Sequence, residues 1–155
     1  MRIVVLADTH VHMLEHLSKK IINAISTVDL IIHAGDFTDV KLLEELKRLR
    51  EVKAVQGNMD SMGIKTLLPV KEIVEVNNKL IGITHGSGSP WGIEGRVKKI
   101  FESNPIDVIV YGHSHRSQNT VVDGILFFNP GKATDSFGIL TIGVEANGEI
   151  INSRL

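Results

Sequence analysis

Residues 2–10 read RIVVLADTH, an apolar run that ends in Asp8 and His10. Short runs rich in valine and isoleucine are typical of a buried strand, here residues 2–7. The same arrangement returns at residues 30–36, which read LIIHAGD, where a strand is expected at Leu30–His33 and the segment ends in Asp36. Two apolar strands, each followed at once by an acidic side chain, predict a sheet with a polar site at the ends of its strands.

Helical patterns separate these strands. Residues 13–25 and 42–49 place leucine, isoleucine and alanine at the spacing that covers one face of a helix. A third strand is expected at Val52–Val55. Strands that alternate with helices of this length form βαβ units, whose crossovers favour a parallel sheet with helices on its outside. The first half of the chain therefore predicts the α/β class.

The second half carries the signals of β-hairpins. The turn residues Asn77-Asn78, Asp123-Gly124 and Asn147-Gly148 each lie between apolar runs. One helix, residues 93–103, and one apolar strand, residues 108–111, lie between the first two of these hairpins. The pattern predicts two packed sheets with helices outside them.

Composition excludes several classes of protein. At 155 residues the chain fits one domain over residues 1–155. It has no cysteine, which excludes disulfides and thiolate metal sites. A formal net charge of −1 offers no basic face for duplex nucleic acid, and no apolar run is long enough for a membrane span or a signal peptide. We expect a cytoplasmic protein that binds neither duplex nucleic acid nor a membrane.

Seven side chains that can bind metals follow the predicted strands. In an open α/β sheet the carboxyl ends of parallel strands meet at one edge, where ligands bind. Two pairs among them, Asp8 with His10 and His113 with His115, are spaced two residues apart. In extended backbone the two side chains of such a pair point to the same side. Glycines beside them allow tight turns. The seven are Asp8, His10, Asp36, Asn58, His85, His113 and His115.

Seven nitrogen and oxygen ligands exceed the needs of one ion that still binds water, but they suit two ions that share a carboxylate. Because only Asp8 and Asp36 are carboxylates, two dications would leave a net charge of about +2, which attracts phosphate and acidifies water. The mixed donors favour Mn²⁺, Fe²⁺, Zn²⁺, Co²⁺ or Ni²⁺ over Ca²⁺. We expect two divalent cations, with Mn²⁺ as the first choice.

Several motifs in a fixed order carry a family resemblance. They read Asp8-Thr9-His10, Gly35-Asp36, Gly57-Asn58-Met59-Asp60, His85-Gly86, Gly112-His113-Ser114-His115 and Asn129-Pro130-Gly131. This order resembles the calcineurin-like metallophosphoesterase superfamily, and the small size resembles its prokaryotic YfcE-like phosphodiesterase branch. The resemblance covers almost the whole chain. It implies a four-layer αββα sandwich of two mixed β-sheets flanked by helices.

The resemblance also implies roles for the seven side chains. It places Asp36 between two metals and makes Asp36, Asn58 and His113 the catalytic residues. The implied reaction is hydrolysis of a small phosphodiester by in-line attack of a metal-bridging hydroxide. The first metal would be held by Asp8, His10, Asp36 and His115. The second would be held by Asp36, Asn58, His85 and His113.

Two positions depart from the family pattern. Met59 stands where many members carry a histidine that protonates the leaving oxygen, and methionine has no proton to donate. Since general-acid help is worth about 10²–10⁴-fold, esters with poor leaving groups are disfavoured as substrates. Lys132 follows the Asn-Pro-Gly motif where members often carry serine, and it either contacts phosphate or faces solvent.

The remaining histidines and two further side chains have simpler interpretations. His33 lies inside an apolar run and is expected to be a hydrogen-bonded core residue. His12 and His16 have helical spacing but no third ligand nearby, so we place them on a helix surface. Trp91 either stacks on a substrate or fills a hydrophobic gap. Arg96 either clamps phosphate or is a surface charge.

Two other functions fit the same residues. A phosphomonoesterase would use the same chemistry, and the sequence does not separate it from a diesterase. A Vps29-like protein-binding scaffold with a vestigial metal site would use the fold as a surface, and retention of every ligand argues against it. A nuclease would need basic or aromatic strips, whereas aromatic residues make up only 5% of this chain. The physiological ester and a homo-oligomeric state stay open.

Overall fold

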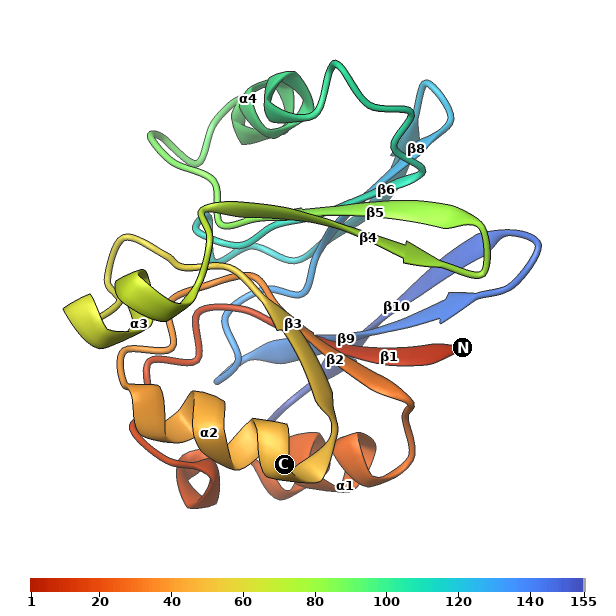
Figure 1. Ribbon diagram of the computed structural model, residues 1–155. Coiled ribbons are helices and arrows are strands. Elements are labelled where there is room, and N and C mark those ends of the chain that lie inside the picture. The colour runs from red at the N-terminus through yellow and green to blue at the C-terminus, as the bar shows by residue number, and fades with distance from the viewer. Residues whose placement is uncertain (155) are drawn as a thin grey trace.

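The apolar runs of the first half form the centre of one sheet. The computed structural model describes residues 1–154. β1 (Arg2–Leu6) pairs in parallel with β2 (Leu30–His33), which pairs in parallel with β3 (Glu51–Ala54). The antiparallel strands β9 (Ser136–Ile142) and β10 (Ala146–Asn152) lie on the other side of β1, so the order is β10-β9-β1-β2-β3 (Figure 1).

The second sheet is built from two hairpins around a central strand. One hairpin is β4 (Lys71–Val76) with β5 (Lys79–Thr84), and the other is β7 (Gln118–Val122) with β8 (Ile125–Asn129). Between them β6 (Val108–Val110) pairs in parallel with both β5 and β8, giving the order β4-β5-β6-β8-β7. Both sheets are therefore mixed.

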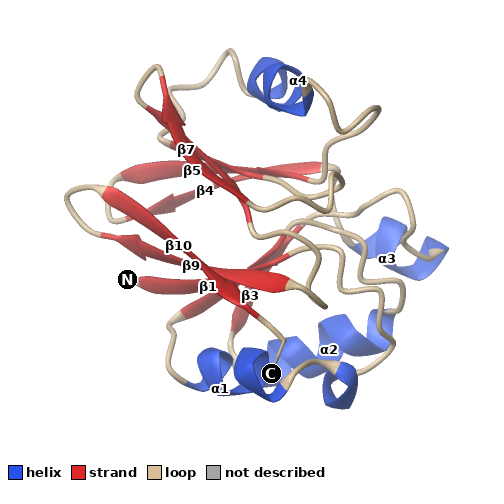
Figure 2. Ribbon diagram, turned by 180° about the vertical axis from the view of Figure 1, so that it is seen from behind, coloured by secondary structure: helices blue, strands red, loops and turns tan. Residues whose placement is uncertain are grey.

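Helices cover the outer faces of the two sheets. α1 (Lys19–Ser26) and α2 (Val40–Leu49) pack on the first sheet, and α4 (Ile93–Ile100) packs on the second. Figure 2 shows the resulting four layers, with α4 above the sheets and α1 and α2 below them. The predicted αββα sandwich is confirmed. No helix among the described residues is long and apolar enough to cross a membrane.

The two sheets pack against each other through an apolar core. Val5 and Ile32 of the first sheet and Ile83, Val110 and Phe128 of the second belong to one buried cluster. Full burial of a side chain of this size contributes about 1.5–3 kcal/mol. Because the cluster joins the sheets, it also holds the loops at the ends of their strands in a fixed relation.

A capping serine divides the helix that the spacing predicts at residues 13–25. Leu14–His16 form a short 3-10 turn, η1, and α1 begins only at Lys19. The hydroxyl of Ser18 accepts a hydrogen bond from the backbone N–H of Ile21 at 3.3 Å, the contact that starts many α-helices. The prediction of one continuous helix was wrong because the cap overrides the apolar spacing.

The turn expected at Asn147-Gly148 lies elsewhere. These two residues are inside β10, opposite Thr141 and Leu140, and the chain turns at residues 143–145 instead. Glycine at position 148 has a packing reason, since a Cβ there would overlap the ring of Phe128. The prediction of a turn was wrong because Gly148 allows the close approach of Phe128 to a strand and does not form a turn.

One helix, α3 (Met62–Leu67), is too short for its apolar spacing to be seen in the sequence. It begins where the hydroxyl of Ser61 accepts a hydrogen bond from the backbone N–H of Ile64, and Ile64 is its one buried residue. α3 lies beyond the end of β3, beside the loops that follow the first sheet (Figure 1). It therefore forms part of the wall around the strand ends.

Candidate metal centre

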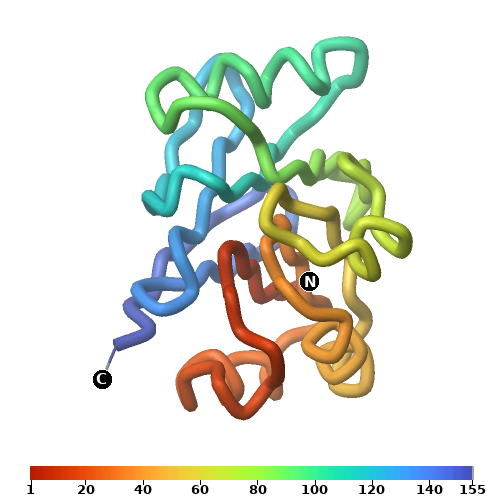
Figure 3. Tube along the Cα trace, turned by 90° about the vertical axis from the view of Figure 1, so that its left-hand side faces the viewer, coloured from red at the N-terminus to blue at the C-terminus, as the bar shows by residue number. Residues whose placement is uncertain are grey.

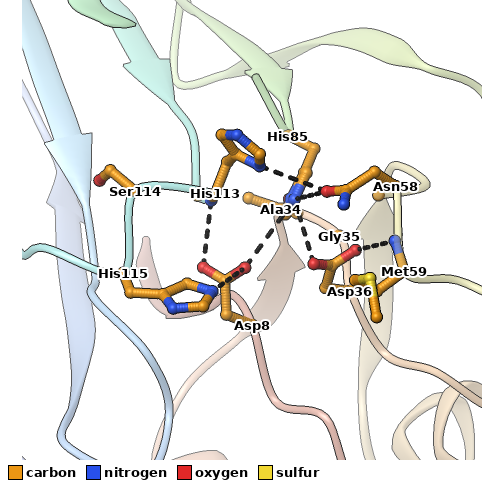
Figure 4. A network of polar contacts seen from close by, with 12 residues as sticks. Asp8, Ala34, Gly35, Asp36, Asn58, Met59, His85, His113, Ser114 and His115 are labelled. Carbon is orange, nitrogen blue, oxygen red and sulfur yellow. Dashed lines mark hydrogen bonds and ion pairs between the residues drawn. The ribbon is translucent and has the colours of Figure 1, made fainter. Parts of the chain in front are cut away.

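The loops after five strands bring all seven predicted ligands into one site. The loops that follow β1, β2 and β3 leave the first sheet at the same edge and face the viewer in Figure 3. The loops that follow β5 and β6 reach the same place from the second sheet (Figure 4). The ligands come from them in the order Asp8 and His10, Asp36, Asn58, His85, then His113 and His115.

One cluster contains Asp8, His10 and His115, whose ligand atoms all lie within 4.8 Å of one another. Nε2 of His115 is 3.4 Å from Oδ1 of Asp8. Oδ1 of Asp8 and Nε2 of His10 are buried without any hydrogen-bond partner. Buried polar atoms without partners are rare because each costs free energy. A cation between them would satisfy both.

A second cluster centres on His85. Its Nδ1–H donates to the carbonyl of Ala34 at 2.7 Å, which leaves Nε2 as the nitrogen that can bind a metal ion. That Nε2 lies 3.3 Å from Oδ2 of Asp36 and 3.1 Å from Oδ1 of Asn58. It is also 3.8 Å from Oδ1 of Asp8. This imidazole nitrogen and the three oxygen atoms therefore converge on one place, as donors around a metal ion do.

His113 adds the same arrangement from the other side. Its Nε2–H donates to the carbonyl of Gly88 at 2.8 Å, which leaves Nδ1 facing Oδ1 of Asn58 at 3.2 Å. Its backbone N–H donates to Oδ2 of Asp8 at 3.1 Å. Histidine ligands usually donate the second ring N–H to a carbonyl or carboxylate, which fixes the nitrogen that binds the metal. The loop at Gly88 therefore orients His113.

The two clusters share Asp8, and Asp36 reaches both of them. Oδ2 of Asp36 lies 3.3 Å from His85 and 3.8 Å from Nε2 of His10. The resemblance assigns the bridging role to Asp36, and its position between the two histidines is compatible with that assignment.

The backbone at the ligands is not extended, contrary to the assumption made from their spacing. φ is +50° at Asp8, +48° at His10, +60° at Asp36, +67° at His113 and +58° at His115. Residues other than glycine seldom adopt this left-handed backbone conformation, and such strained residues are concentrated at functional sites. The paired side chains do reach one site, but a kinked backbone directs them there.

Asp60 ties two of the ligand loops together. Its Oδ2 accepts hydrogen bonds from the backbone N–H groups of Asp36 at 3.0 Å and Gly57 at 2.7 Å, and its Oδ1 accepts from Thr38 at 2.8 Å. The sequence predicts that Asp60 orients Asn58 or a metal-bound water, whereas its hydrogen bonds here go to the backbone of both ligand loops. Its position in the Gly-Asn-x-Asp motif was the available signal.

Asn129 fixes the loop that carries His113. Its amide donates to the carbonyl of Gly112 at 3.1 Å and to the hydroxyl of Ser114 at 3.0 Å, while its Oδ1 accepts from Gly131. The side chain is fully buried. The Asn-Pro-Gly motif therefore holds the loop that carries His113 in place.

His33 is a buried support rather than a ligand, as predicted. Its Nδ1 accepts from the backbone N–H of Gly35 at 3.1 Å, so its Nε2–H donates to the hydroxyl of Thr9 at 3.1 Å. Thr9 in turn donates to the carbonyl of Asp36 at 3.3 Å, and the imidazole stacks on Phe37. This chain of contacts joins the loops after β1 and β2.

Burial shapes the charges of the ligands. It raises the pKa of Asp8 to about 7, with a further rise from the charge of Asp36. Burial also opposes charge on Asp36 and His85, but the hydrogen bond between them lowers the pKa of Asp36 and raises the pKa of His85. Burial lowers the pKa values of His10 and His115, which keeps these two imidazoles neutral for metal binding. Two buried carboxylates this close fit a site made for cations.

The other side chains singled out in the sequence lie around this centre or away from it. Arg96 donates to the backbone carbonyls of Ser87, Ser89 and Trp91, so it holds the loop after β5. Trp91 is 72% exposed and fills no hydrophobic gap. The guanidinium of Arg116 lies 4.5 Å from its ring centroid.

Two exposed histidines and one lysine complete the set. His12 and His16 lie outside both clusters, as expected, near Asp39 and Glu15 respectively. The predicted helix surface holds for His16 alone, which ends η1, because His12 lies before that turn. Lys132 is half-buried. Its positive charge lowers the pKa of His10, although burial and the charge of Asp36 have larger effects on that pKa.

Comparison with known proteins agrees with this geometry. The calcineurin-like phosphoesterase superfamily domain matches residues 1–144. A probable metallophosphoesterase of Methanocaldococcus jannaschii is 40% identical over 136 residues, covering 86% of this chain and 69% of the relative. A phosphodiesterase of the same organism is 31% identical over 158 positions, covering 93% of this chain and 92% of the relative.

A solved structure shares the fold at lower identity. Wild-type Vps29 from Entamoeba histolytica, complexed with Zn²⁺, is 23% identical with a TM-score of 0.78, covering 99% of this chain and 100% of that one. Fold and donor cluster together define a metal-dependent phosphoesterase. This chain belongs to the calcineurin-like phosphoesterase superfamily.

Proposed function

We propose that this protein is a divalent-metal-dependent phosphodiesterase that hydrolyses small phosphodiesters. The observation that carries the proposal is the convergence of seven nitrogen- and oxygen-bearing side chains, two of whose buried atoms, Oδ1 of Asp8 and Nε2 of His10, have no hydrogen-bond partner. A scaffold that uses only its outer surface has no need for such a cluster. The phosphodiesterase among the relatives supports the diester class.

The seven side chains would hold two cations, with Mn²⁺ as the first choice. When bound, divalent cations acidify water and offset the charge that phosphate develops in the transition state. Asp36 would lie between the two cations, and Asn58 and His113 would flank the phosphate on the open side, where Asn58 is exposed. Asp8, His10 and His115 would complete one ligand set, and Asn58, His85 and His113 the other.

Met59 argues for esters with good leaving groups. Its side chain is 61% exposed and has no acidic proton to donate, while its backbone N–H donates to Oδ1 of Asp36 at 2.8 Å. The residue therefore helps to orient Asp36 but cannot protonate a leaving oxygen. Diesters of acidic alcohols or phenols need this help least.

The test compares two chromogenic esters. Metal-stripped protein is assayed on bis-p-nitrophenyl phosphate and p-nitrophenyl phosphate before and after addition of Mn²⁺, Ni²⁺ or Zn²⁺. We expect metal to restore turnover, with the higher kcat/KM on the diester. Asp36→Asn and His113→Ala should each lower kcat by about 10²-fold or more, whereas His16→Ala, at an exposed histidine outside the site, should not.

Two outcomes would replace the proposal. A higher kcat/KM on the monoester would make the protein a phosphomonoesterase with the same metal centre. Folded protein that binds metal but hydrolyses neither ester would favour a Vps29-like scaffold, in which the metal site has no catalytic use.

A further inference from the structure

A cavity of about 470 Å³ opens beside the second cluster of the metal centre. Asn58 and His85 form one side of it, so it is continuous with the site that would hold the phosphate. Its other walls include the aliphatic side chains of Val70 and Ile100 and two lysines, Lys65 and Lys71. A cavity of this size admits a small organic group.

Lys65 is held against a metal-ligand residue. It lies on α3, and its ammonium donates to the backbone carbonyl of Asn58 at 3.2 Å. The amide of Gln56 donates to the carbonyl of Lys65 at 3.2 Å and to the carbonyl of Leu68 at 2.7 Å. These contacts fix the C-terminal end of α3 to the cavity wall, so the ammonium stays near the metal centre.

Lys71 approaches from the second sheet. In the register of β4 and β5 it pairs with Thr84, the residue that precedes His85. Its ammonium donates to the carbonyl of Ile100, at the end of α4, at 3.3 Å. The two lysines therefore come from different elements: Lys65 is bonded to the backbone of Asn58, and Lys71 lies opposite Thr84, the neighbour of His85.

The charges of these lysines are not offset by the protein. Among residues 1–154, no carboxylate lies within 4.0 Å of either ammonium, and no aspartate or glutamate lines the cavity. Each ammonium gives one recorded hydrogen bond to a carbonyl, which leaves donors for a ligand. Divalent cations beyond Asn58 and His85 would add more positive charge at the same end.

We infer that this cavity binds a second anionic group of the substrate, a carboxylate separated from the scissile phosphate by a short carbon chain. Lys65 and Lys71 would bind the anion, and Val70 and Ile100 would contact the carbon chain. The inference rests on the proposed function, because the metal centre is what would hold the phosphate. It narrows the substrates to phosphate esters with an anionic substituent.

The test uses ligands that cannot be hydrolysed. Metal-loaded protein is titrated calorimetrically with ω-phosphonocarboxylates of increasing chain length and with the alkylphosphonates of matching length. The phosphonate reports on the metal centre in both series, and the carboxylate is the only difference. We expect one chain length at which the carboxylate-bearing ligand binds about tenfold more tightly, as for a charge-assisted hydrogen bond.

Variants assign that preference to the lysines. The affinity ratio should fall towards one in the double variant Lys65→Ala with Lys71→Ala, and Lys65→Arg should keep it. Lys47→Ala, which removes a lysine from the exposed face of α2, is the matched control and should keep the full ratio. Because each comparison is a ratio within one variant, a general loss of metal or of stability does not imitate the result.

Two results would overturn the inference: equal affinities of wild-type protein for the two ligand series at every length, or a preference that survives in the double lysine variant. The ratio does not depend on turnover, so failure of the subsite is distinct from failure of the hydrolase. A preference for the carboxylate in a protein that hydrolyses no ester would retain the subsite and refute the proposed activity.

Discussion

The carboxylate of Asp60 accepts a hydrogen bond from the backbone N–H of Asp36 at 3.0 Å. The same carboxylate accepts from Gly57 and Thr38. The loop after β2 supplies Asp36, and the loop after β3 supplies Asn58. One buried side chain therefore sets the distance between two proposed ligands without being a ligand itself.

Asp60→Asn should weaken metal binding. The amide has a single acceptor oxygen, so its NH₂ group would face at least one of the three backbone donors. An unsatisfied buried donor costs about 1–3 kcal/mol of stability, and loss of a contact that orients metal ligands typically costs about 10–100-fold in metal affinity. Calorimetric metal titration and urea unfolding measure the two effects. Asp123→Asn, at an exposed turn, is the control, and wild-type metal affinity in Asp60→Asn would contradict the assigned role.

Gly57→Ala should disrupt the site through a direct clash. A Cβ at this position would overlap Oδ1 of Asp36 and lie 2.5 Å from its backbone nitrogen. We expect the metal affinity to fall by at least about tenfold, since a misplaced ligand no longer completes the site.

Gly95→Ala provides the matched substitution. A Cβ there meets nothing within 4 Å, and the residue lies inside α4. This variant should gain about 0.5–1 kcal/mol of stability because alanine is the better helix former, and its metal affinity should not change. Equal metal affinity in both alanine variants would show that the approach of Gly57 to Asp36 does not matter.

Metal binding should release a proton from Asp8. Burial raises the pKa of this carboxyl group to about 7 in the metal-free protein, and a cation binds the carboxylate form. Below about pH 7 the proton must leave first, so the affinity should fall by up to about tenfold per pH unit through this group. His10 and His115, with lowered pKa values, add little to this release, whereas His85, whose pKa Asp36 raises, adds to it.

Titration in buffers of different ionisation enthalpy counts the protons released. We expect more protons to be released at about pH 6 than at about pH 8. The same number at both values would mean that Asp8 is already ionised in the metal-free site.

His33 should make the metal-free fold less stable in acid. Burial lowers its pKa from 6.5 to about 3, so the unfolded chain takes up the proton first as the pH falls. The stability that the neutral imidazole contributes is complete above pH 6.5 and is lost as the pH falls towards 3, at up to about 1.4 kcal/mol per pH unit. Asp8 acts in the opposite direction, so the two effects must be separated by a variant.

Urea unfolding of wild type and His33→Gln at about pH 7 and about pH 5 makes this separation. The glutamine variant should start from a lower stability but lose less of it in acid. Parallel losses in the two proteins would show that His33 is not buried in its neutral form.

The strands of the first sheet could be predicted because each apolar run stops where a polar ligand begins. β2 has the bounds that its sequence predicts, and β3 differs by one residue at each end. The ligands were predictable for the same reason, since parallel strands release their chains at one edge. α1 and β10 were harder because Ser18 and Gly148 act through a cap and a close packing contact, which apolar spacing does not reveal.

The support of the site could not be derived from spacing. Positive φ at Asp8 and His113 arises because tertiary contacts hold these residues in a strained backbone. The role of Asp60 depends on which backbone donors approach it, and the role of Asn129 depends on a loop that lies far from it in the sequence. Such contacts become visible only when neighbouring strands of each sheet, β2 with β3 and β6 with β8, bring their loops together.

The most direct test of the central claim is the rate of bis-p-nitrophenyl phosphate hydrolysis as metal-stripped protein is titrated with Mn²⁺, with bound metal measured in the same samples. We expect no turnover without metal, and a rate of hydrolysis that saturates when two cations are bound per chain. Turnover that needs no metal, or bound cations that produce no turnover, would contradict the central claim.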